Sequence, residues 1–103
     1  MNTDYSREIP EKWKMMAKVF EAMGNEHRQR ILLTFEKGEE LSIKELVEVS
    51  TLKRTSVVHH LQILENAGVL VPIKKGKFVY YHINPDIVIE ACNGLISYAN
   101  KMK

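Results

Sequence analysis

Two short stretches of the chain are rich in side chains that bind phosphate groups or the edges of nucleic-acid bases. The first contains Lys53, Arg54, Thr55, Ser56 and His59, and the second contains Lys74, Lys75 and Lys77. Ammonium and guanidinium groups pair with phosphate oxygens, whereas hydroxyl, imidazole and guanidinium groups also hydrogen-bond to base edges. This combination of residue types favours binding to a nucleic acid.

The distribution of charge supports the same interpretation. Residues 53–82 contain five lysine or arginine residues and one glutamate, a net charge of +4, although the whole chain of 103 residues has a net charge of only +2. Such clustering is typical of a phosphate-binding face. Charge alone leaves open the alternative of a solvated surface on which charges are unevenly spread.

Apolar spacing and helix-capping residues predict the elements that would position these side chains. A first helix is expected between Pro10 and Gly24, with an apolar face made of Trp13, Met16, Ala17, Phe20 and Met23. A second helix is expected at about 26–37, ended by Gly38. A third, short helix is expected at about 43–49, because Ser42 and Glu45 have the spacing of a capping box.

A fourth helix, a hairpin and a last helix follow. The fourth helix is expected from Thr55 or Ser56 to Ala67, after a polar turn. Residues 69–73 and 78–83 are rich in β-branched and aromatic residues, and Gly76 between them can take the positive φ of a tight turn. Pro72 belongs on an edge strand. Asn84, Pro85 and Asp86 are typical of a helix start, so the last helix is expected from 85 to about 101.

The predicted fold class is therefore mainly α with a small β-hairpin, in the order helix, helix, short helix, helix, hairpin, helix. We expect residues 1–9 to be a flexible arm and residues 10–103 to be a single domain. Two short helices joined by a tight turn and followed by a basic hairpin form a winged helix-turn-helix. Its second helix enters the major groove and its hairpin, the wing, lies beside it, so Arg54, Ser56 and His59 are candidates for base contacts.

The chain also resembles a family, the ArsR/SmtB-type metalloregulator repressors, over roughly residues 15–83. The resemblance rests on the segments MGNEHRQRIL (23–32), LSIKEL (41–46), VVHHLQILENAGVL (57–70) and GKFVYYHI (76–83). It implies a homodimeric repressor that binds a double-stranded DNA operator with two-fold symmetry. Val58 departs from the family pattern, which has serine there. Valine donates no hydrogen bond, so this residue either contacts a thymine methyl group or packs inward.

The metal sites that the resemblance implies lack their ligands in this chain. Ser42 and Lys44 stand where the family has a Cys-x-Cys pair, and neither is a soft-metal ligand. The last helix offers Asp86 and Glu90 but no histidine. His59 and His60 are adjacent and point to different sides of a helix, and we expect His60 to pack or hydrogen-bond. We therefore predict no metal site and no cofactor.

The resemblance places the dimer interface on the first and last helices, and the wide apolar arc of the last helix agrees with this. The expected interface residues are Trp13, Met16, Phe20, Ile87, Ala91, Leu95, Tyr98 and Met102. A core within one protomer is the alternative explanation for the same residues. Cys92, the only cysteine, is expected to be a small buried thiol rather than a redox switch.

Other classes of function have less support. No nucleophile–base pattern, glycine-rich phosphate loop or convincing pair of carboxylates predicts an enzyme. The absence of a long apolar run and of a disulfide pair predicts a cytoplasmic protein without a membrane partner. The main alternative is a winged-helix module that contacts another protein instead of DNA, and a further possibility is a small organic ligand held between the last helices. The inducer is left undetermined.

Overall fold

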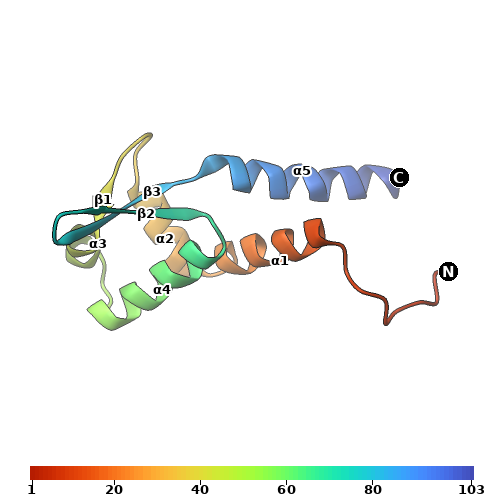
Figure 1. Ribbon diagram of the computed structural model, residues 1–103, viewed down its shortest axis with the longest axis horizontal. Coiled ribbons are helices and arrows are strands. Elements are labelled where there is room, and N and C mark those ends of the chain that lie inside the picture. Colours follow the sequence, from red (N-terminus) through yellow and green to blue (C-terminus); the bar gives the residue numbers. More distant parts are fainter.

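Helices α1 and α5 lie side by side and project from a group formed by the other elements (Figure 1). The computed structural model describes residues 1–103. Its helices are α1 (Glu11–Met23), α2 (Glu26–Thr34), α3 (Ile43–Val49), α4 (Arg54–Asn66) and α5 (Pro85–Lys101), and its strands are β1 (Leu41–Ser42), β2 (Leu70–Lys75) and β3 (Phe78–Ile83). Residues 1–10 are exposed and contain no helix or strand. None of the helices has the length and apolar character needed to cross a membrane.

The three strands form one antiparallel sheet in the order β1-β3-β2. The expected hairpin of β2 and β3 is present. β1 adds a third strand to it, since Leu41 pairs with Tyr81 of β3. Pro72 lies in β2, which is an edge strand. The N–H that proline lacks would be on the unpaired side of β2, so no hydrogen bond with β3 is lost. Gly76 has a φ of 60°, and β2 and β3 are joined by the two residues Gly76 and Lys77.

Local capping explains why several elements begin where they do. The Ser42 hydroxyl accepts a hydrogen bond from the N–H of Glu45, and the Glu45 carboxylate accepts one from the N–H of Ser42, which is the expected capping box of α3. The Asn84 side chain caps α5, with Pro85 as its first residue. These caps satisfy N–H groups that have no partner within the helix.

The core lies where the helix-turn-helix meets the sheet and the first helix. Its largest fully buried side chains come from α1, α3, α4, the first residue of β2 and the residue before it, namely Met16, Val19, Leu46, Val57, Leu61, Leu64, Val69 and Leu70. The expected inward positions of α4 are confirmed, since Val57, Leu61 and Leu64 are all buried. One face of α4 is therefore fixed against the core, and its opposite face is exposed to solvent.

The expected apolar face of α1 was partly wrong. The buried residues are Met16, Val19 and Ala22, whereas Ala17 is exposed and Trp13 is 37% exposed. The reason is that α1 packs against α5, α4 and α2, so the buried stripe is rotated towards Val19 and Ala22. Trp13 lies at the edge of this stripe, where its ring meets that of Tyr98 edge-on at a centroid distance of 5.1 Å.

Two helix boundaries also differ from expectation. Helix α2 ends at Thr34 rather than near Lys37, because Phe35 adopts an extended backbone and packs against the core. The expected last turn is replaced by a separate turn in which the N–H of Glu39 donates to the carbonyl of Glu36. Helix α4 begins at Arg54 rather than at Thr55 or Ser56, so the side chain of Arg54 lies on the helix itself.

Candidate nucleic-acid interface

The turn between α3 and α4 is fixed by one hydroxyl group. The Ser50 Oγ atom accepts from the N–H of Leu52 at 3.2 Å and lies 3.2 Å from the carbonyl oxygen of Val47. Leu52 packs against the core directly before α4 begins. These contacts hold the turn between α3 and α4 in one conformation, as a helix-turn-helix requires.

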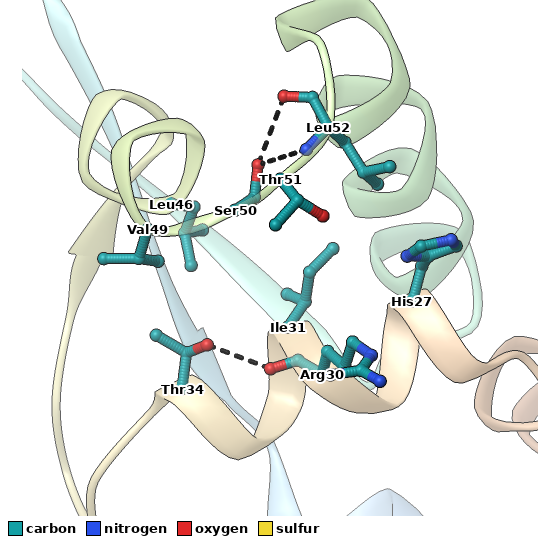
Figure 2. Close-up of a pocket in the computed structure, with 9 residues that line it drawn as sticks. All are labelled: His27, Arg30, Ile31, Thr34, Leu46, Val49, Ser50, Thr51 and Leu52. Carbon is teal, nitrogen blue, oxygen red and sulfur yellow. Dashed lines mark hydrogen bonds between the residues drawn. The ribbon is translucent and has the colours of Figure 1, made fainter.

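A cleft lies between α2 and this turn (Figure 2). It has a volume of about 190 Å³ and is lined by His27, Arg30, Ile31, Thr34, Leu46, Val49, Ser50, Thr51 and Leu52. The hydroxyl of Thr34 donates to the carbonyl of Arg30, and that of Ser50 bonds within the turn, as the dashed lines in Figure 2 show. These two hydroxyls are therefore satisfied within the protein.

The start of α4 presents positive charge that no carboxylate neutralises. Lys53 is the N-cap residue, and Lys53, Arg54 and Thr55 are all exposed. None of the ion pairs in the structure involves Lys53 or Arg54, and the first turn of α4 contains no acidic residue. The N-cap side chain accepts no hydrogen bond from the helix, so the first N–H groups of α4 have no side-chain acceptor at Lys53. Free N–H groups and the helix dipole favour a phosphate at this position.

The solvent-facing side of α4 carries most of the expected base-contacting residues. His59 is exposed, whereas Ser56 and Val58 are half-buried. Val58 is absent from the side chains that pack against the core, which leaves its methyl groups accessible in part. Gln62, three residues after His59, is also exposed and is not among the residues that the sequence predicts to contact DNA. The i, i+3 spacing from an expected contact residue was the signal that would have identified it.

The wing separates its three lysines into different environments. Lys74 pairs across the strands with Val79, on the face of the sheet that also carries Leu70 and Tyr81 into the core. Lys75 pairs with Phe78 on the opposite face. Gly76 has positive φ and Lys77 does not, as in a type II′ hairpin turn.

Lys74 and Lys77 are exposed and free of ion pairs, but Lys75 is not free. Its ammonium group forms an ion pair with the carboxylate of Glu40 and lies 5.2 Å from the centroid of the Tyr80 ring. The hydrogen bond with Glu40 raises the pKa of Lys75. Phe78 follows Lys77 and is 58% exposed, and it is not among the residues that the sequence predicts to contact DNA. The structure thus distinguishes two lysines that are available to a phosphate from one that is already paired.

The expected interface residues of α1 and α5 fall into two groups. Trp13, Leu95, Tyr98 and Met102 are exposed, and Phe20 and Ile87 are half-buried. Met16 and Ala91 are only 2% and 0% exposed within one chain, because they form part of the contact between α1 and α5. These two residues therefore have almost no surface to offer to a second copy.

The remaining candidates for ligand chemistry are dispersed. No group of three or more histidine, cysteine, aspartate or glutamate side chains is arranged to hold a metal ion. Of the two residues at the family's Cys-x-Cys positions, Ser42 is a buried helix cap and Lys44 is exposed.

Cys92 is exposed, which contradicts the expected burial of this thiol. It lies on the side of α5 that faces away from α1, because Ala91 and Gly94 occupy the buried side.

Comparison with known proteins agrees with this geometry. Residues 25–70 match the family described as "Bacterial regulatory protein, arsR family". The transcriptional repressor SdpR of Bacillus subtilis is 31% identical over 84% of this chain and 94% of its own length, and the arsenic resistance transcriptional regulator ArsR1 of Pseudomonas putida is 32% identical over 67% of this chain and 54% of its own length.

Solved structures show the same fold. An ArsR-like transcriptional regulator from Rhodococcus sp. RHA1 superposes with a TM-score of 0.79 at 21% identity, and the match covers 87% of this chain and 84% of that one. Its fold is the winged helix-turn-helix described above. The chain therefore belongs to the ArsR family of bacterial regulatory proteins and is a DNA-binding transcription regulator.

Proposed function

We propose that this protein is a homodimeric repressor that inserts α4 of each protomer into the major groove of a two-fold symmetric operator. The observation that carries this proposal is the unpaired positive charge at the start of α4, where Lys53 and Arg54 are exposed and have no acidic partner. Lys74 and Lys77 extend this charge along the wing. Phosphate contacts from these residues would fix the position of α4, and Ser56, Val58, His59 and Gln62 would then face the bases.

The surface of α1 and α5 supports the dimer. Five large apolar side chains at the projecting end are exposed in the single chain, namely Trp13, Leu95, Ile96, Tyr98 and Met102. This end lies away from α4 and the wing (Figure 1), so two copies joined here would leave both DNA-binding faces free. A two-fold axis at this interface suits two copies of α4 spaced by one DNA turn, about 34 Å.

A signal other than a metal ion is favoured for release from DNA. The positions of the family's thiolate ligands hold a helix cap, Ser42, and an exposed lysine, Lys44. The similar SdpR of Bacillus subtilis is described as a transcriptional repressor, which supports repression as the mode of action. We further propose that the protein acts in the cytoplasm, where its target DNA lies.

The decisive experiment compares DNA binding by the wild type with that of a Lys53→Glu/Arg54→Glu variant. Fluorescence anisotropy would use a duplex from upstream of the protein's own gene and a scrambled duplex, each at several salt concentrations. We expect salt-sensitive binding that prefers the native duplex, and a loss of at least about 100-fold in the variant, because four units of charge change at a phosphate-binding surface. Arg7→Glu/Lys37→Glu is the matched control, since it makes the same charge change at two exposed residues that form no ion pair and lie outside α4, the wing and the proposed dimer surface.

Two outcomes would overturn the proposal. Equal losses in both charge-reversal variants would mean that only net charge matters and that α4 is not the contact. Absence of binding by the wild type even at low salt would favour the alternative, a winged-helix module that contacts another protein. A monomeric mass by sedimentation at micromolar concentration would refute the homodimer separately.

A further inference from the structure

Arg28, in the first turn of α2, connects three helices through its guanidinium group. Its Nε atom donates to the carbonyl of Ala22 at 2.6 Å and its Nη2 atom donates to the carbonyl of Glu21 at 3.1 Å, both near the end of α1. Its Nη1 atom lies 3.2 Å from Nδ1 of His60 in the middle of α4. The backbone N–H of Arg28 is itself held by the Asn25 side chain, which caps α2.

The chemistry of this contact fixes the state of His60. A guanidinium group has only donors, so Nδ1 of His60 must be the acceptor and must carry no proton. The imidazole is then neutral, with its proton on Nε2. The contact between Arg28 and His60 therefore exists only while His60 is uncharged.

The charged groups around His60 all oppose its protonation. Burial lowers the pKa of His60, and the positive charges of Arg28, His27 and His59 lower it further. The rings of His27 and His59 lie 5.8 Å and 5.9 Å from the His60 ring, measured between centroids. No acidic group is among those that act on the His60 ring.

The acidic side chains of the neighbouring helices are placed elsewhere. On α2, the carboxylate of Glu26 pairs with Arg30 at 2.7 Å. On α1, Glu21 and Lys18 line a groove with Ile63 and Asn66 of α4, which follow His60 in the sequence. A proton added to His60 would thus meet Arg28 without a compensating negative charge.

We propose that His60 is a positioning residue whose neutral ring holds α4 against α1 and α2, and that its protonation loosens this contact and reduces sequence-specific DNA binding. A proton on Nδ1 replaces the acceptor with a second donor and places two positive charges about 3 Å apart. Arg28 keeps its two bonds to the carbonyls of α1, so the strain is relieved by movement of α4. His59, which precedes His60, moves with the helix. The link to DNA rests on the proposed function of α4.

The first test measures the structural coupling without DNA. His60→Asn is the informative variant, because the amide oxygen of asparagine can occupy the place of Nδ1 and accept from Arg28 but cannot be protonated. The unfolded chain takes up the proton at His60 near pH 6.5, whereas the folded chain takes it up only at a lower pH. The free energy of unfolding of the wild type should therefore fall as the pH drops below about 6.5.

We expect His60→Asn to lose most of this pH dependence while it stays folded at neutral pH. His82→Asn is the matched control, because His82 lies in β3 and bonds to the carbonyl of Ile83 rather than to Arg28. A wild-type pH dependence in His60→Asn would overturn the proposal. An NMR titration in which the His60 ring gains its proton at or above pH 6.5 would also overturn it.

The second test measures specificity. The ratio of affinities for the native and scrambled duplexes would be determined at about pH 7.5 and about pH 5.5, at constant ionic strength. The ratio is the right quantity, because an effect of pH on phosphate binding changes the affinity for both duplexes alike and cancels in the ratio. We expect the wild-type ratio to fall by about three- to tenfold and the His60→Asn ratio to stay within about twofold.

The two tests separate the possible failures. A constant wild-type ratio, together with the expected unfolding data, would refute the link between His60 and DNA reading. If the wild type never prefers the native duplex, the proposed operator is wrong, but the unfolding and NMR data still decide whether His60 couples protonation to the docking of α4.

Discussion

The ammonium group of Lys75 in the wing forms an ion pair with the carboxylate of Glu40, which precedes β1 in the sequence and lies 35 residues before Lys75. In the free protein, Lys75 is therefore already paired with a carboxylate, although the sequence predicts that it binds DNA. A phosphate must therefore compete with Glu40 for Lys75, whereas it meets no such competition at Lys74 or Lys77.

Removal of this competitor should strengthen DNA binding. We expect Glu40→Gln to raise affinity for duplex DNA by about two- to fivefold, the range of an exposed ion pair. The slope of log affinity against log salt concentration should steepen by about one, because one more phosphate is neutralised. Glu36→Gln is the matched control, since it removes the same charge from the same loop but from a side chain without an ion pair. Equal gains in both variants would show that the effect is one of net charge alone.

A second prediction concerns the attachment of the wing to α4. The hydroxyl of Tyr81 in β3 donates to the carboxylate of Glu65 at 3.1 Å, and Tyr81 is almost completely buried. Tyr81→Phe should lower the free energy of unfolding by about 1–3 kcal/mol, as expected for a lost hydrogen bond to a charged acceptor. Urea denaturation would measure this change, with Tyr80→Phe on the opposite face of the strand as the control. A loss below that of Tyr80→Phe would contradict the prediction.

The same tyrosine should also give an alkaline signature. Burial, followed by the hydrogen bond to Glu65, raises the pKa of Tyr81 to about 12 in the folded protein. The folded state holds this proton more tightly than the unfolded state, so the resulting stability is complete below pH 10 and is lost as the pH rises through about 12. Tyr81→Phe should lack this loss in denaturation experiments at increasing pH.

A third prediction concerns the capping box of α3. Ser42→Ala removes the hydroxyl that accepts from the N–H of Glu45, and it should destabilise the protein by about 1 kcal/mol. The hydrogen bond from the Ser42 N–H lowers the pKa of Glu45 below 4.5. The corresponding stability is present above pH 4.5 and is lost as the pH falls through the folded-state pKa.

Glu45→Gln separates the charge from the cap. A glutamine at this position can still accept from the N–H of Ser42, so the helix start is kept while the titration is removed. We expect the acid-induced loss of stability to be smaller in Glu45→Gln than in the wild type. If the loss of stability at acid pH were the same in Glu45→Gln and in the wild type, other carboxylates would be its main cause.

Features that depend on neighbouring residues could be predicted from the sequence. The capping box of Ser42 and Glu45, the cap of α5 by Asn84 and the positive φ of Gly76 all follow from local hydrogen bonds or local sterics, and each is present in the structure. The inward residues of α4 were also predicted correctly, because its opposite face is exposed and its apolar residues therefore form one stripe.

Features that depend on residues far apart could not be predicted in this way. The buried stripe of α1 includes Val19 and Ala22 because α5, α4 and α2 all pack against it. The spacing of apolar residues within α1 does not indicate how many helices will pack against it. The Lys75–Glu40 and Arg28–His60 contacts join residues 35 and 32 positions apart. Composition suggested that all three wing lysines were equivalent, whereas the fold makes one of them a partner of Glu40.

The last prediction concerns the contact between α1 and α5. Gly94 of α5 faces Met16 so closely that a Cβ atom at position 94 would lie 2.8 Å from Met16 Sδ and 3.1 Å from Lys12 Cε. Lys12 is exposed and can move, but Met16 is buried and has little room. Gly94→Ala should therefore destabilise the protein by about 1–2 kcal/mol through overpacking, even though alanine favours a helix by about 1 kcal/mol over glycine.

A double-mutant cycle tests whether the clash with Met16 is the cause. Met16→Ala alone should cost about 2–5 kcal/mol because it leaves a cavity in the contact between α1 and α5. In that background the methyl group of Gly94→Ala meets no sulfur atom and only its helix preference remains, so the second substitution should stabilise by about 0.5–1 kcal/mol. Denaturation midpoints of the four proteins give the sign directly. The same destabilisation by Gly94→Ala in both backgrounds would place its cause outside the contact with Met16.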